Sequence, residues 1–383
     1  MNSIPFNRPT LIGKEVTYLR DAIRRGQLSG DGYYTEQCNA LIMQLTGAPK
    51  ALLTHSCTAA LEMAALLCDL KPGDEVIMPS FTFVSTANAV ALRGATPVFV
   101  DIDPVTLNID PAQVAAAMGP RTRAIFAVHY AGFASDMDAL ADIANTHDAM
   151  LVEDAAQAMG STYKERPCGS LGDLAAFSFH ETKNIISGEG GALTINRADL
   201  VERAEIIREK GTDRAKFFRG QVDKYSWVEI GSSFLPGELI ASYLCAQLEM
   251  AEMIKVRRMS IFERYMEAFA PLQEAGRIQL PRWSADCTGN GHMLYFLMQD
   301  IEDRTAFIDH MRNHGIGTPF HYVPLHSAPA GKRHGRARGS MKVTNRISDT
   351  LVRLPMFFDL GSQAEMVIDI ALAYFEDQPG GLT

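Results

Sequence analysis

The stretch AAFSFHETKN at residues 175–184 runs on to the glycine-rich segment GEGG at residues 188–191. Its first five residues are mostly apolar, which is typical of a short buried strand. Ser178 lies within this predicted strand, and Lys183 lies just beyond its end. The glycines that follow let the backbone turn tightly and approach a ligand closely. We therefore expect a buried strand that delivers one lysine to a ligand site.

Six further short apolar runs resemble this strand, and helical patterns separate most of them. They lie at residues 51–54, 76–78, 97–100, 124–128, 150–152 and 192–195. Strands that are apolar on both faces and alternate with helices indicate a mainly parallel sheet covered on both sides. The sequence therefore predicts an α/β fold with a mainly parallel, seven-stranded sheet.

Helical spacing of apolar residues also predicts helices at residues 12–26 and 33–46, before the first strand. One long helix over about residues 237–268 would lead away from the sheet. Short strands and helices follow it to the end of the chain. We thus expect a large domain over residues 1–250 and a smaller C-terminal α/β domain over residues 251–383.

The bulk composition excludes several classes of protein. The chain has 383 residues and a net charge of −9, which argues against a nucleic-acid partner because phosphate backbones need a basic surface. None of the six cysteines forms a C-x-x-C pair, so we expect reduced thiols in the cytoplasm and no metal. We find no apolar core of a signal peptide and no run long enough to span a membrane.

Polar residues follow the first predicted strand at the edge where open α/β sheets bind ligands. Ser56, Cys57 and Thr58 open a helix there. Free N–H groups and the helix dipole at such a point suit a phosphate. An ordinary helix cap is the alternative interpretation of the same residues.

Asp154 and Gln157 follow the strand at residues 150–152, and Phe83 follows the strand at residues 76–78. A lysine such as Lys183 at a buried strand end can have a lowered pKa and form a Schiff base with a carbonyl. A carboxylate such as Asp154 can hold a ring nitrogen protonated, and an aromatic ring can stack on a cofactor. Together these features indicate pyridoxal phosphate. A dinucleotide site is not indicated, because no G-x-G-x-x-G follows the first strand.

Motifs spread over nearly the whole chain resemble the DegT/DnrJ/EryC1/StrS aminotransferases. They are SFH at 178–180 with KN at 183–184 and GEGG at 188–191, EDAAQ at 153–157, MPSFTFVSTANA at 78–89, GDG at 30–32 and HYVPLH at 321–326. The resemblance implies a fold-type-I, aspartate-aminotransferase-like large domain that binds pyridoxal phosphate. It also implies amination of a keto group on a nucleotide-linked sugar.

The resemblance assigns a role to each matching residue. Lys183 would form the covalent link to the cofactor and move the proton, and Asp154 would pair with the ring nitrogen. The remaining cofactor contacts would come from Gln157 at the ring's hydroxyl side, Phe83 on the ring face, and Ser56, Cys57, Thr58 and Ser178 at the phosphate.

Two positions depart from the family pattern. Ser233 stands where an asparagine usually reaches the phosphate of the partner subunit, and Leu235 stands where an arginine is usual. A serine can still donate a hydrogen bond, so Ser233 remains a candidate cofactor contact. Because family sites lie between subunits, the resemblance implies a homodimer or a higher homo-oligomer.

The segments IREKGT at 207–212 and FFRGQVDKY at 217–225 resemble a subgroup that aminates 4-keto-6-deoxyhexoses, with glutamate as the expected donor. Arg214, Arg219 and His326 are the candidate contacts to the sugar nucleotide. The arginines could equally belong to a segment that only packs on the partner subunit. One alternative is an aminotransferase that acts on another keto-sugar nucleotide. The other two are a sugar dehydratase of the same family, in which histidine replaces the lysine, and a non-catalytic cofactor-binding sensor.

Overall fold

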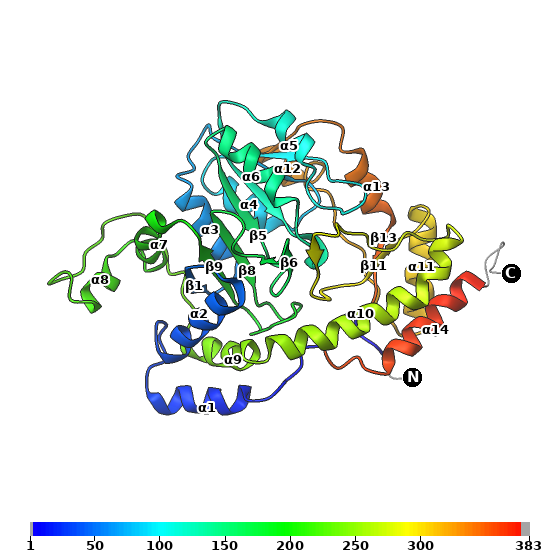
Figure 1. Ribbon diagram of the computed structural model, residues 1–383, viewed down its shortest axis with the longest axis horizontal. Helices are drawn as coiled ribbons and strands as arrows, with labels where there is room; N and C mark the ends of the chain where they lie inside the picture. Colours follow the sequence, from blue (N-terminus) through cyan, green and yellow to red (C-terminus); the bar gives the residue numbers. More distant parts are fainter. Residues whose placement is uncertain (1–2, 377–383) are drawn as a thin grey trace.

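The computed structural model describes residues 3–376, and the last seven residues of the predicted small domain lie outside this range. An eight-stranded sheet forms its centre, with the order β1-β9-β8-β5-β4-β2-β3-β12 (Figure 1). The strands are β1 (Lys50–Thr54), β2 (Glu75–Pro79), β3 (Thr96–Val100), β4 (Thr122–Val128), β5 (Met150–Asp154), β8 (Leu174–Ser178), β9 (Gly191–Ile195) and β12 (Arg336–Ala337).

All seven predicted strands are present in this sheet, and the prediction of a mainly parallel α/β fold is confirmed. β9 runs antiparallel to both of its neighbours, whereas the pairs from β8 through β5, β4 and β2 to β3 are parallel. The eighth strand, β12, comes from the C-terminal part of the chain and pairs in parallel with β3. A strand of two residues has no periodicity, so no sequence pattern marks it.

Successive residues of each strand point to opposite sides of the sheet, and a hydrophobic core covers each side. On β1, Leu52 packs into one hydrophobic core and Leu53 into the other. The helices around these two cores are α1 (Glu15–Arg25), α2 (Tyr33–Thr46), α3 (Cys57–Leu67), α4 (Val84–Ala91), α5 (Pro111–Ala117), α6 (Met137–Thr146), α7 (Val201–Arg208) and α9 (Glu238–Leu248). No helix within residues 3–376 has the length and apolar character needed to cross a membrane.

The prediction of one long helix over residues 237–268 is wrong, because this segment forms two helices. α9 ends at Leu248, and α10 (Ala251–Glu274) begins three residues later. Neither proline nor glycine marks the break, so periodicity alone joins the two segments. α9 packs on α1 and α2, and α10 continues from it toward the C-terminal helix α14 (Figure 1).

The C-terminal part packs around a two-stranded antiparallel sheet of β11 (Tyr295–Leu297) and β13 (Leu351–Arg353). Its helices are α11 (Ile301–Asn313), α12 (Pro329–His334), α13 (Lys342–Thr350) and α14 (Gln363–Glu376). The short helix α8 (Arg214–Phe218) does not belong to this part and lies at the opposite end of the molecule (Figure 1). Three short strands, β6 (Thr162–Tyr163), β7 (Arg166–Pro167) and β10 (Cys287–Thr288), form a further sheet.

Several contacts cross the boundary predicted at residue 250. β12 joins the central sheet, β10 pairs with β6, and Ile4 forms a parallel bridge with Ile316. The N-terminal segment thereby lies against the C-terminal part of the chain. The two-domain division remains a prediction, but this packing places residues from both ends of the chain beside the carboxyl edge of the sheet.

Candidate active site

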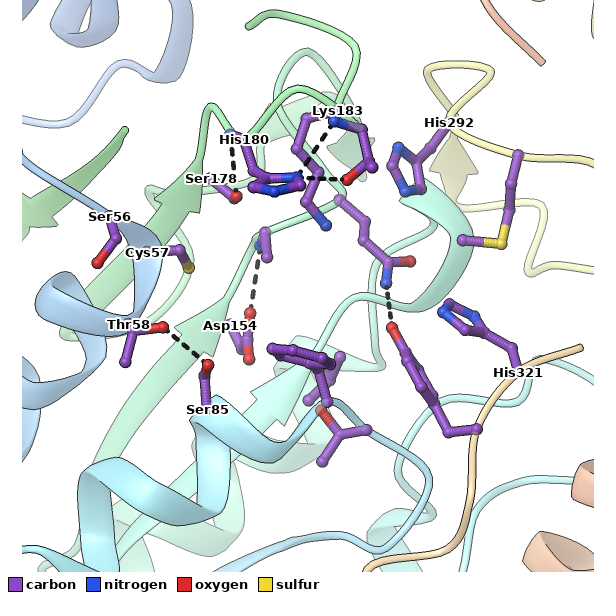
Figure 2. A pocket seen from close by; sticks show the side chains of 18 of the residues that line it. Ser56, Cys57, Thr58, Ser85, Asp154, Ser178, His180, Lys183, His292 and His321 are labelled. Atoms are coloured by element: carbon purple, nitrogen blue, oxygen red, sulfur yellow. Dashed lines mark hydrogen bonds between the residues drawn. The ribbon is translucent and has the colours of Figure 1, made fainter. Parts of the chain in front are cut away.

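A cavity of about 570 Å³ lies at the carboxyl ends of β5 and β8 (Figure 2). One wall consists of the loops and helix starts that follow the strands of the central sheet. The opposite wall comes from the N-terminal segment and the C-terminal part: Phe6, Asn7, His292, Met293, His321, Tyr322, Arg353 and Met356. The cavity thus lies where α/β sheets bind their ligands.

Lys183 reaches this cavity from the loop after β8, as predicted. A turn closed by its N–H and the carbonyl of His180, at 2.9 Å, directs the chain back toward the sheet. Burial lowers the pKa of Lys183, although the nearby Cys57 and Asp154 act in the opposite direction. A neutral amine is the nucleophilic form, so this surrounding favours reaction with a carbonyl.

Asp154 ends β5 and lies in the same cavity (Figure 2). Its carboxylate accepts a hydrogen bond of 2.7 Å from the Thr86 hydroxyl and one of 3.3 Å from the N–H of Ala156. Burial raises the pKa of Asp154, while these hydrogen bonds and Lys183 partly offset the effect. A carboxylate this poorly solvated gains much from a cationic partner such as a protonated ring nitrogen.

Behind Asp154, a fully buried pair holds the strand end in place. The N–H of His129 donates to the Asp154 carbonyl over 3.1 Å, and the His129 ring contacts Glu153 over 2.9 Å. The N–H of Ser135 donates to His129 Nδ1, so the ring proton lies on Nε2 and points to Glu153. Cys168 lies close enough to complete a metal site with these two side chains. Glu153, however, already accepts three backbone N–H groups besides His129, so its role is structural.

At the start of α3, Ser56 acts as an ordinary helix cap, and Cys57 and Thr58 offer a phosphate site, so both interpretations of this segment apply. The Ser56 hydroxyl caps the helix by accepting from the N–H of Ala59 over 3.1 Å. The N–H groups of Cys57 and Thr58 have no hydrogen-bond partner within the described residues, so they remain available to a phosphate. Gly191 faces this turn, and a side chain there would overlap the backbone of Ser56 and Cys57.

The other predicted cofactor contacts on the sheet side also line the cavity. Ser178 lies near the start of α3, and Phe83 lies at the start of α4 with 59% of its surface exposed. Gln157 is held within the wall, because its amide oxygen accepts from the N–H of Ala131 and its amide nitrogen donates to Tyr322. These positions fit a flat ring with a phosphate at one end.

Four predicted site residues do not line this cavity in the single chain. The predicted role of Ser233 lies across a subunit interface, which one chain does not test. Arg219 pairs with Glu205 at 2.8 Å, and His326 bonds to Ser80. Arg214 lies over the ring of Phe218 on α8. Their roles remain predictions.

The structure adds residues that sequence reasoning did not single out. Thr86 was part of a quoted motif, one helical turn after Thr82, but nothing in the sequence pairs it with Asp154. His292 lies outside any helix or strand, and Arg353 ends the three-residue strand β13, which is too short to give a periodic signal. Their place in the cavity depends on tertiary packing alone.

Known proteins match the chain over nearly its whole length. The model of the DegT/DnrJ/EryC1/StrS aminotransferase family matches residues 9–371. The chain is 36% identical over 337 residues to the spore coat polysaccharide biosynthesis protein SpsC of Bacillus subtilis, and the match covers 85% of each chain.

Solved structures agree with this result. The aminotransferase TlmJ from Streptoalloteichus hindustanus has a TM-score of 0.89 and 31% identity, over 97% of this chain and 99% of its own. The putative sugar aminotransferase Spr1654 from Streptococcus pneumoniae has a TM-score of 0.88 and 26% identity over 97% of this chain. Its PMP form is covered over 98% of its length and its PLP form over 100%. The predicted fold-type-I architecture is confirmed.

Proposed function

Since the chain belongs to the DegT/DnrJ/EryC1/StrS aminotransferase family, we propose that it moves an amino group from an amino acid to a keto sugar carried by a nucleotide. It is an aminotransferase, and the predicted pyridoxal phosphate cofactor is confirmed at the level of the family. The observation that carries the proposal is the meeting of Lys183 and Asp154 in one cavity with the free amides at the start of α3.

Each of the main cavity residues would have its own role toward the cofactor. Pyridoxal phosphate supplies an electron sink and stores the amino group between two half-reactions. Lys183 would hold it covalently and then move a proton at the substrate carbon. Asp154 would stabilise the positive charge of its ring nitrogen. The N–H groups of Cys57 and Thr58 would bind its phosphate.

The substrate that we propose is dTDP-4-keto-6-deoxyglucose, with dTDP-4-amino-4,6-dideoxygalactose as the product and glutamate as the donor. The segments at residues 207–212 and 217–225 support this choice through their resemblance to that subgroup. The relative SpsC, named for polysaccharide biosynthesis, supports a role in making a surface polysaccharide or antigen such as lipopolysaccharide. Lys183 argues against the dehydratase alternative, because that branch has histidine in place of the lysine.

We further propose a cytoplasmic homodimer. The six cysteines are free thiols and five of them are buried, which suits a reducing compartment. The segment around α8 exposes Phe218, Tyr225 and Trp227, with 70%, 54% and 76% of their surfaces accessible. Apolar surface of this extent favours burial against a second subunit.

The test begins with the visible absorption band of the purified protein and with amination across a panel of keto-sugar nucleotides, read by mass spectrometry. Lys183→Ala should lose the band and multiple turnover. Lys255→Ala is the matched control, since Lys255 bonds to the Gly160 carbonyl outside the cavity. Near-normal turnover by Lys183→Ala would overturn the assignment. A deoxygenated sugar product without nitrogen would favour the dehydratase. A visible absorption band without any sugar product would favour the sensor.

A further inference from the structure

Arg353 is a cation in the cavity without an acidic partner. It ends β13 and lies on the wall opposite the sheet. Its Nη2 donates to the Phe320 carbonyl over 3.0 Å, and its guanidinium lies 4.4 Å from the centre of the Phe6 ring. Its Nε is buried and has no hydrogen-bond partner. Arg353 forms no ion pair with any residue in the range 3–376.

The acidic groups of the cavity lie elsewhere. Asp154 is on the sheet wall, where Thr86 and Lys183 face it, and Glu189 is exposed beside His180. The neighbours of Arg353 carry no negative charge. Burial raises the pKa of Tyr322, and burial together with the charge of Arg353 holds the pKa of His321 well below its ordinary range. The wall opposite the sheet therefore presents one uncompensated positive charge to the cavity.

A partly buried guanidinium without a counter-ion destabilises the folded protein, because it has lost part of its hydration. An anion that binds beside it offsets this loss. The planar fork of arginine matches a carboxylate in particular. We propose that Arg353 binds a carboxylate of the amino-acid donor. This inference rests on the proposed function, because a donor is needed only if the chain transfers amino groups.

The position of Arg353 favours the donor over the sugar nucleotide. Arg353 and Lys183 both line this one cavity, and the charge of Arg353 contributes to lowering the pKa of Lys183. A donor amino acid must bring its amine to the Lys183 side of the cavity, and its α-carboxylate is attached to the same carbon. A nucleotide diphosphate carries two charges, whereas this wall offers one cation.

The binding test uses the cofactor-loaded enzyme and glutarate, a dicarboxylate that has no amine to react. Calorimetry should show that Arg353→Met weakens glutarate binding about 10- to 100-fold, the range expected for a charge-assisted hydrogen bond. Arg353→Lys should fall between this variant and the wild type, because it keeps the charge and loses the fork. Unchanged glutarate affinity in Arg353→Met would overturn the proposal.

Arg304→Met is the matched control. Arg304 also has a buried Nε without a partner and lies 5.2 Å from the ring of Phe320, but it bonds to the Ser348 carbonyl outside the cavity. This variant should bind glutarate as the wild type does. If Arg353→Met does not fold, Arg353→Lys carries the comparison, and wild-type glutarate affinity in that variant together with unchanged glutamate kinetics would overturn the proposal.

Stopped-flow measurement of the two half-reactions separates the remaining outcomes. We expect Arg353→Met to raise the glutamate concentration needed for half-maximal rate and to leave the reaction with the keto sugar unchanged. Equal slowing of both half-reactions, or weakening of the sugar half-reaction alone, would overturn the donor assignment. A wild-type protein that reacts with neither substrate would instead refute the proposed function.

Discussion

The Thr86 hydroxyl lies 2.7 Å from a carboxylate oxygen of Asp154, although 68 residues separate them in the chain. The Thr82 hydroxyl lies 3.0 Å from that of Thr86, so a short chain of hydroxyl groups leads from the start of α4 to the carboxylate. Since an ionised Asp154 can only accept, Thr86 donates to it and accepts from Thr82. The chain stabilises the charged form of a carboxyl group whose pKa burial raises.

Asp154→Asn should retain the cofactor and lose most of its rate. The amide cannot stabilise a positive ring nitrogen, and removing such an electrostatic contact costs on the order of 10²-fold or more in rate. Thr86→Val should cost less, about tenfold, because it removes one charge-assisted hydrogen bond and raises the pKa of Asp154 further. Single-turnover rates with glutamate measure both effects. A change below about threefold for Asp154→Asn would contradict its role.

Gly191→Ala should weaken cofactor binding. Gly191 has no side chain where β9 passes the start of α3, and a methyl group would meet the backbone of Ser56 and Cys57. Relieving this overlap must displace the turn that carries the free N–H groups, and such overpacking lowers the free energy of unfolding by about 1–3 kcal/mol. Equilibrium dialysis with pyridoxal phosphate gives the affinity, and thermal unfolding gives the stability. Gly13→Ala, at a glycine with open space around it, is the control. Equal affinities in both variants would refute this account of the turn.

The sequence was sufficient for the parts of the site that lie on regular elements. Apolar strands followed by polar residues placed Lys183 and Asp154 at one edge of the sheet, because parallel strands share the same carboxyl edge. It was insufficient where the C-terminal part folds back. His292 and Arg353 reach the cavity through packing between segments far apart in the chain, and neither local periodicity nor spacing encodes such contacts. The break between α9 and α10 escaped prediction for a similar reason, since no helix-breaking residue marks it.

The two arginines proposed to bind the sugar nucleotide should differ in effect. Arg219 already pairs with Glu205 at 2.8 Å and bonds to Gln221. Arg214 forms no ion pair within residues 3–376 and lies 5.1 Å from the Phe218 ring centre, so its charge is uncompensated. Arg214→Gln should therefore raise KM for the sugar nucleotide more than Arg219→Gln does, and the glutamate half-reaction should be almost unaffected. If both half-reactions slow equally in Arg214→Gln, the segment has a structural role.

A network of amides fixes the proton on His292. The Asn184 side chain donates its N–H to the Asn290 carbonyl over 2.9 Å, which leaves its oxygen facing His292 Nδ1, also at 2.9 Å. His292 must therefore carry a proton on Nδ1. Burial, followed by the charges of Lys183, Arg258 and Arg353, holds the pKa of His292 well below its ordinary value. The imidazole is accordingly neutral in the folded protein.

This neutral His292 should make the protein less stable in acid. Its folded-state pKa is depressed, so below the ordinary value of about 6.5 the unfolded chain binds more protons than the folded one. The corresponding stability is complete above pH 6.5 and is lost as the pH falls below it, by up to about 1.4 kcal/mol per pH unit for one histidine. His292→Gln should therefore reduce the fall in the unfolding midpoint between pH 7 and pH 5. His314→Gln, at an exposed histidine, should leave the slope as in the wild type. Parallel pH profiles for His292→Gln and the wild type would mean that folded His292 binds a proton as readily as it does in the unfolded chain, contrary to its depressed pKa.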